Sequence, residues 1–198
     1  IDAGEHQRAG VDDGDRPAGD TEARQAIAGL GQVDRGAAGV DGVTVHDFAD
    51  KTRELWPAIR RQLLDGTYAP QPVRRKAIPK PDGSPRMLGI PTVLDRLIQQ
   101  AVLQVLTPLF DPGFSESSFG YRPRRSAHGA VKQVRRWVQE GRRIAVDLDL
   151  TKFFDRVQHD VLMARVSRKV KDRRGLVLIG RYLRAGAMVE GVLQPVEM

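Results

Sequence analysis

Two aspartates lie two residues apart in a segment whose apolar residues alternate. The apolar residues are Ile144, Val146, Leu148 and Leu150, and Asp147 and Asp149 fall between them. This period of two predicts a β-strand over 144–150 with both carboxylates on one face. Carboxylates bind Mg²⁺ in phosphoryl-transfer sites, but same-face residues are about 7 Å apart, so a further ligand has to come from elsewhere. The alternative is the ordinary polar face of a half-buried strand.

Two aromatic residues, Phe153 and Phe154, follow this segment directly. One ring is suited to pack beneath a site at the end of the strand, and the other to lie against a sugar. Burial of both rings in the core is the competing interpretation.

Basic side chains are concentrated in residues 74–86. Five cations stand against one acid, Asp82, and they are Arg74, Arg75, Lys76, Lys80 and Arg86. Pro81-Asp82-Gly83 separates two β-compatible stretches, which predicts a hairpin between Val73 and Ile90. Lys supplies a point charge and Arg a forked donor, a combination that holds a triphosphate tail. The hairpin is interpreted as a lid over phosphates, with a charged, solvated sheet edge as the alternative.

A second basic cluster follows Phe119 and Tyr121. Its members are Arg122, Arg124, Arg125, Lys132, Arg135, Arg136, Arg142 and Arg143, with Glu140 as the single acid. Contact with a nucleic-acid backbone is the natural use of such a cluster.

The elements that must position these residues alternate between helices and strands. Helical spacing predicts helices over 47–65, from a Thr92 cap to Pro108, after a Ser126 cap, over 157–170 and over 174–184. A second hairpin is expected in 187–196, around Glu190-Gly191. Helices mixed with antiparallel strands give an α+β fold class.

Length and composition bound these interpretations. The chain has 198 residues, 40% hydrophobic and 29% charged, which suits one domain or two joined lobes and argues against a disordered chain. No apolar run reaches the roughly 18 residues of a spanning helix, so no membrane partner is expected. The sequence has no Cys, which excludes thiol nucleophiles and Cys-based zinc sites from it.

Charge is distributed unevenly along the chain. The total is +7, yet residues 1–22 hold seven acids and two arginines, so the remaining 30 basic and 18 acidic side chains give 23–198 a net charge of +12. This excess suits a partner made of phosphates. Residues 1–22 carry no apolar signal-peptide core, and we expect them to be a disordered or non-native lead-in.

Five ordered blocks resemble the reverse transcriptases encoded by bacterial group II introns, the intron maturase family. The blocks are GAAGVDGVT (36–44), LLDGTYAPQPVRRKAIPKPDGSPRMLGIPTVLDRLIQQAV (63–102), SSFGYRPRRSAHGAV (117–131), AVDLDLTKFFDRVQHD (145–160) and RYLRAGAM (181–188). Their order over roughly 160 residues makes the match far more specific than a lone motif.

The resemblance implies a right-hand polymerase, with fingers over 23–140 and the start of the palm over 141–198. It implies that Asp149 is a catalytic metal ligand, and that the backbone carbonyl of Leu150 assists the same Mg²⁺ beside the nucleotide. Phe154 matches the aromatic residue that packs under the nucleotide sugar, whereas Asp147 receives no role. Lys80 and Arg86 match the residues that grip the triphosphate. The remaining candidates for nucleic-acid contact are Arg74, Arg75, Lys76, Arg122, Arg124 and Arg125.

The implied activity is RNA-directed DNA synthesis in intron mobility and RNA splicing, in the bacterial cytoplasm. Its partners are an RNA template, a DNA primer, group II intron RNA and deoxynucleoside triphosphates. The sequence ends before the Tyr-Ala-Asp-Asp hairpin that completes the family's metal site, so we expect an incomplete palm sheet and no polymerisation by this chain alone. A non-catalytic RNA-binding maturase fragment, a degenerate remnant and a plain basic globular domain are the alternatives. The oligomeric state stays open.

Overall fold

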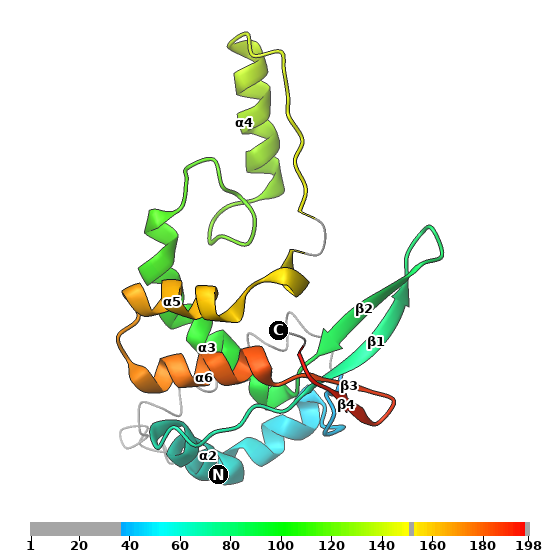
Figure 1. Cartoon of the computed structure of the whole chain (residues 1–198), viewed down its shortest axis with the longest axis vertical. Coiled ribbons are helices and arrows are strands. Elements are labelled where there is room, and N and C mark those ends of the chain that lie inside the picture. Colours follow the sequence, from blue (N-terminus) through cyan, green and yellow to red (C-terminus); the bar gives the residue numbers. More distant parts are fainter. Residues whose placement is uncertain (1–36, 151–152, 197–198) are drawn as a thin grey trace, which may run out of the picture.

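The computed structural model describes residues 37–150 and 153–196 (Figure 1). Its helices are α2 (Val45–Leu64), α3 (Val93–Phe110), α4 (Ala127–Gln139), α5 (His159–Lys169) and α6 (Arg173–Arg184), with the short 3-10 turns η1 (Asp111–Gly113) and η2 (Phe154–Arg156). Its strands are β1 (Val73–Pro79), β2 (Pro85–Ile90), β3 (Ala187–Val189) and β4 (Val192–Gln194). The α+β class is thereby confirmed. The expected lead-in over 1–22 lies outside the described residues.

The helices begin where side chains cap them. Thr92 Oγ1 accepts a hydrogen bond from the backbone N–H of Asp95 at 3.1 Å, and Ser126 Oγ accepts one from Gly129 at 3.2 Å, so both predicted caps are confirmed. The predicted end of α3 at Pro108 is wrong, because the helix runs on to Phe110. Pro108 stands in the last turn, where the helix ends two residues later and little of it is left for proline to disrupt.

One mixed sheet joins both ends of the described chain, with strand order β2-β1-β3-β4. β1 pairs antiparallel with β2 and parallel with β3, and β3 pairs antiparallel with β4. Both predicted hairpins are confirmed. Val73 stands opposite Ala187, and its N–H also donates to the Gly186 carbonyl oxygen at 3.1 Å. The base of the first hairpin is therefore fixed by the segment that follows α6.

Two small apolar clusters hold the helices together. Phe48 of α2 packs with Val93 and Leu97 of α3 in the first cluster. Ile59 of α2, Tyr68 and Ile98 of α3 form the second, which is extended by partly buried residues of α6. The core therefore lies between α2, α3 and α6. Within the residues described, no helix is long and apolar enough to cross a membrane.

Helix α4 and the segment after it lie away from this core, at the opposite end of the long axis from α2 (Figure 1). The predicted strand over 144–150 is wrong, since these residues are extended but unpaired. Ile144 is 90% exposed and Leu148 is 87% exposed. A strand needs a partner for its backbone hydrogen bonds, and no strand of the described sheet pairs with this segment. The alternation specifies two faces but not what covers either of them.

Candidate nucleotide and nucleic-acid interface

The first hairpin exposes cations on both of its faces. Paired residues of a sheet point to the same side and neighbours along a strand to opposite sides. Arg74, Lys76 and Arg86 therefore share one face, and Arg75 occupies the other. Lys80 stands at the turn, where its N–H donates to the Ser84 carbonyl oxygen at 2.9 Å. All five side chains are exposed.

The one carboxylate near these cations belongs to the turn. Asp82 accepts hydrogen bonds from the N–H of Ser84 at 2.9 Å and from its hydroxyl at 2.7 Å. These bonds hold the pKa of Asp82 below its ordinary value. Gly83 adopts a φ of +79°, which suits a residue without a Cβ. Among the described residues, no carboxylate pairs with the five cations, so they are available to an anion from outside.

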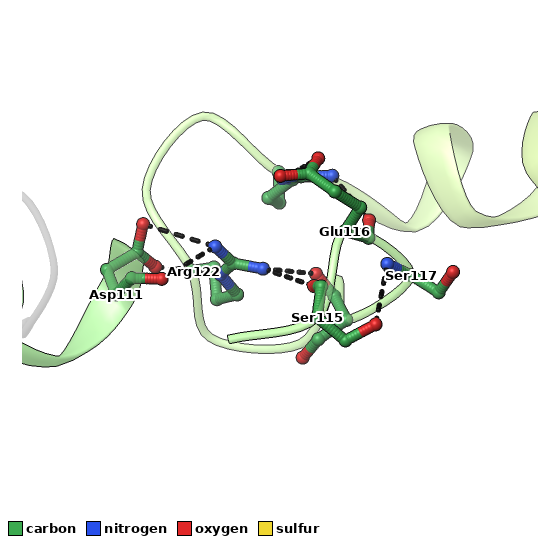
Figure 2. Close-up of polar contacts among 7 residues, drawn as sticks. Asp111, Ser115, Glu116, Ser117 and Arg122 are labelled. Carbon is green, nitrogen blue, oxygen red and sulfur yellow. Dashed lines mark hydrogen bonds and ion pairs between the residues drawn. The ribbon is translucent and has the colours of Figure 1, made fainter. Parts of the chain in front are cut away.

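Arg122 organises the loop between α3 and α4 (Figure 2). Its Nε and Nη2 donate to the Asp111 carboxylate at 2.7 and 3.2 Å, and Nη2 also donates to the Asp111 carbonyl oxygen at 3.0 Å. Its Nη1 donates to the carbonyl oxygens of Ser115 and Ser118 at 2.7 and 3.2 Å. The hydrogen-bonded Arg122 guanidinium lowers the pKa of the Asp111 carboxyl.

This network uses all five N–H donors of the guanidinium, and the Arg122 side chain is only 7% exposed. The structure therefore argues against the predicted nucleic-acid contact by Arg122, because no donor is left for a phosphate. A basic sequence cluster does not distinguish an arginine that faces solvent from one that folds a loop.

Arg125 also supports the loop. It donates to the Glu116 carbonyl oxygen and to the Glu116 carboxylate, both at 2.8 Å, and lies over the Phe119 ring, 5.4 Å from its centre. Arg124 differs, because it is exposed and forms no hydrogen bond or ion pair with the described residues. Of these two predicted contacts, Arg124 is the one left open to solvent.

Two residues of this loop adopt the left-handed backbone region. Tyr121 has a φ of +54° and Arg124 a φ of +59°. This conformation costs a residue with a Cβ about 1–2 kcal/mol, so the surrounding contacts must impose it. The hydrogen bonds of Arg122 and Arg125, which alternate with the two strained positions, supply those contacts.

The segment that carries Asp149 is open to solvent. Asp147 and Asp149 are exposed, and neither forms a hydrogen bond or ion pair with the described residues. The Leu150 carbonyl oxygen accepts a hydrogen bond from the N–H of Phe153 at 3.2 Å. The Phe153 and Phe154 rings meet edge to face with centres 5.3 Å apart, and both are exposed, so the alternative of core burial is wrong.

A buried carboxylate that the sequence marked only as part of a helix cap ties three elements together. Asp95 is 1% exposed. Its carboxylate accepts hydrogen bonds from the Tyr68 hydroxyl at 2.8 Å, the Thr92 hydroxyl at 2.7 Å, the Tyr182 hydroxyl at 3.0 Å and the N–H of Gln71 at 3.2 Å. It thereby joins α3 to α6 and to the loop that leads into β1.

The two tyrosines make the fold sensitive to alkaline pH. Burial, followed by the neighbouring Asp95 carboxylate, raises the pKa of both the Tyr68 and Tyr182 hydroxyls above their ordinary value. A raised folded-state pKa stabilises the fold fully below the unfolded pKa of about 10, and this contribution falls as the pH rises above it. We expect the urea midpoint to drop between pH 9 and 11, and to drop less in a Tyr68→Phe, Tyr182→Phe variant. Equal drops would contradict this account.

Comparison with known proteins places this geometry in a family. A family model described as "Reverse transcriptase (RNA-dependent DNA polymerase)" matches residues 78–194, more than half of the chain. The chain belongs to the reverse transcriptase family. The match includes most of the basic hairpin, the Arg122 loop and Asp149.

Relatives of this reverse transcriptase chain carry consistent names. It is 36% identical over 167 residues to Protein YkfC of Escherichia coli strain K12, which covers 79% of the chain and 42% of that protein. It is 43% identical over 142 residues to the group II intron-encoded protein LtrA of Lactococcus lactis subsp. cremoris, covering 71% of the chain and 24% of LtrA. Nuclear intron maturase 1, mitochondrial, of Arabidopsis thaliana is 32% identical over 100 residues, 48% of the chain and 13% of that protein. The resemblance to group II intron reverse transcriptases is confirmed, and the chain spans less than half the length of each relative.

Reverse transcriptase domains use divalent metal ions, and the described residues offer part of such a site. Asp149 presents an unpaired carboxylate, and the Leu150 carbonyl keeps one lone pair beyond its bond to Phe153. Octahedral Mg²⁺ needs about six oxygen ligands. Within 37–150 and 153–196, no three His, Cys, Asp or Glu side chains gather as a metal cluster. The two residues therefore fit a metal as two of its ligands and not as a complete site.

Proposed function

We propose that this chain forms the fingers, over 23–140, and the first part of the palm, over 141–198, of an RNA-directed DNA polymerase encoded by a group II intron. The protein acts in intron mobility and in splicing of intron RNA, on an RNA template, a DNA primer and deoxynucleoside triphosphates. The observation that carries the proposal is the β1–β2 hairpin, whose five exposed cations have no ion-pair partner among the described residues.

The distal end of the hairpin is the proposed triphosphate site. Arg86 pairs with Ile78, two residues before Lys80, so both cations lie near the turn. The forked guanidinium binds two phosphate oxygens and the ammonium binds as a point charge. Arg74, Arg75 and Lys76 lie closer to the base of the hairpin and bind the nucleic-acid backbone.

The Asp149 segment is the proposed reaction centre. A Mg²⁺ ion held by the Asp149 carboxylate and the Leu150 carbonyl would neutralise charge on the reacting phosphate oxygens. The exposed Phe154 ring lies against the sugar of the incoming nucleotide, which orients it. Asp149 carries negative charge in an extended segment without a competing cation among the described residues, so its carboxylate is available to the ion.

Nucleotide kinetics of the intact protein test the hairpin's role. We expect Lys80→Ala and Arg86→Ala each to raise the KM for deoxynucleoside triphosphates roughly 10–100-fold in RNA-templated primer extension, because each removes a charged hydrogen-bond partner. Lys51→Ala is the matched control, since Lys51 is an exposed cation of α2, outside the hairpin. Its KM should equal that of the parent.

Two outcomes would contradict the proposal. An unchanged KM in both hairpin variants would remove Lys80 and Arg86 from the nucleotide site. Tight binding of intron RNA by an intact parent protein that makes no DNA would favour the alternative, a non-catalytic RNA-binding maturase.

A further inference from the structure

The loop between α3 and α4 presents an aromatic ring to solvent from a fixed backbone. Tyr121 has a relative exposure of 107%, so nothing in the described chain covers its ring. An apolar ring of this size is usually covered in a folded protein. The strained φ of +54° at the same residue shows that the exposure belongs to a defined conformation.

The loop is anchored on both sides of Tyr121. On one side, Arg122 fastens the loop to Asp111 at the end of α3. On the other, Ser126 caps α4 and the Phe119 ring packs on its first turn, where a Cβ on Gly129 would lie 3.2 Å from that ring. The ring of Tyr121 therefore projects from a rigid base, which lowers the entropy lost when it contacts a ligand.

The second strained residue adds charge next to the ring. Arg124 is exposed at a φ of +59°, three residues from Tyr121, and has no partner among the described residues. The helix that follows adds further cations, whereas its one acid, Glu140, is paired with Arg136 at 3.0 Å. Strained non-glycine residues gather at functional sites, and here they bring together one free ring and one free guanidinium.

This pair of groups selects its ligand by chemistry. A flat aromatic ring stacks on a base whose face is open, and a guanidinium binds a phosphate. In a duplex, each base face is already covered by its neighbours, so the ring favours a single strand. An apolar protein surface would cover the ring but would leave the Arg124 charge desolvated without a counter-ion.

We propose that Tyr121 and Arg124 form a binding site for single-stranded RNA, with the Tyr121 ring stacked on an unpaired base and Arg124 bound to an adjacent phosphate. The site deepens the proposed function, on which it rests, by naming where the unpaired part of an RNA template contacts the protein. Arg122 and Arg125 are positioning residues, because they act through the loop backbone and not on the RNA.

Binding of a fluorescently labelled 12-nucleotide single-stranded RNA to the 198-residue chain tests the site. We expect Tyr121→Ala to weaken binding roughly tenfold, since one base–aromatic stack is lost, and Tyr121→Trp to preserve it. Tyr121→Asn should weaken binding equally while relieving backbone strain, because Asn tolerates the left-handed region. This variant separates lost stacking from lost folding.

Salt dependence isolates the contribution of Arg124. For a single strand, each phosphate contact contributes about 0.7 to the slope of log affinity against log salt. We expect Arg124→Gln to lower that slope by about 0.7, and Arg173→Gln, which removes an exposed charge from α6, to leave it unchanged. A 12-base-pair RNA duplex should bind the parent and Tyr121→Ala chains equally.

Three results would overturn the site. One is an unchanged single-strand affinity in Tyr121→Ala and Tyr121→Asn, and another is an equal loss for the duplex. The third is a loss of thermal stability in the intact protein with RNA affinity retained, since the ring would then pack against protein. Each of these would leave the KM effects of Lys80 and Arg86 intact, so failure of the site is distinguishable from failure of the proposed function.

Discussion

The Asp149→Asn variant of the intact protein is expected to synthesise DNA on an RNA template roughly 1,000-fold more slowly than the parent. Metal ions contribute several kcal/mol to such reactions by stabilising transition-state charge, and an amide cannot replace the negative charge that holds the ion. RNA binding, measured in the same preparation, should be unchanged, because Asp149 forms no contact with the proposed RNA-binding side chains.

The neighbouring aspartate is the matched control for this variant. Asp147 lies two residues away in the same extended segment and is equally free of partners among the described residues. Asp147→Asn therefore makes the same change of charge at almost the same place, and we expect it to retain most of the activity. Equal losses in the two variants would mean that the charge of the segment matters and not a ligand at Asp149. Full activity in Asp149→Asn would remove this residue from the mechanism.

The second large effect concerns stability. Asp95→Ala is expected to lower the free energy of unfolding by about 3–5 kcal/mol, because it leaves the buried donors of Tyr68, Thr92 and Tyr182 without an acceptor. A loss of that size is a large fraction of the stability of a domain. Urea unfolding at neutral pH measures it directly.

An exposed helix-capping aspartate provides the comparison. Asp172 accepts a hydrogen bond from the N–H of Arg174 at 2.9 Å at the start of α6, and Asp172→Ala should cost about 1 kcal/mol, as for other helix caps. If Asp95→Ala lowers the free energy of unfolding no more than Asp172→Ala, the buried network adds nothing beyond an ordinary cap.

Local sequence signals predicted the local structure well. Thr92 and Ser126 marked helix starts because capping depends on residues three positions apart. Pro81-Asp82-Gly83 marked a hairpin because a turn is specified by its own residues. The extended segment over 144–150 shows the limit of such signals, since alternation predicts the faces of a strand but pairing requires a partner elsewhere in the chain.

Contacts between distant residues could not be predicted. The sequence placed Asp95 in a helix cap but gave no sign of its bonds to Tyr68 and Tyr182, which lie 27 and 87 residues away. Arg122 was grouped with its basic neighbours, because its pairing with Asp111 across eleven residues depends on how the loop folds. Tyr121 was named only as an aromatic residue near a basic cluster, since its backbone strain has no sequence signal.

The parallel pairing of β1 with β3 has a consequence for the order of folding. Val73 meets Ala187, 114 residues later in the chain, and a ribosome that adds roughly 5–20 residues per second needs roughly 6–23 s to make that length. During this interval, one edge of β1 lacks its neighbour and is open to pairing with other chains. Arg74, Arg75 and Lys76 lie along that strand, and charged residues discourage such pairing. The cations that serve the finished protein therefore also protect the nascent chain from aggregation.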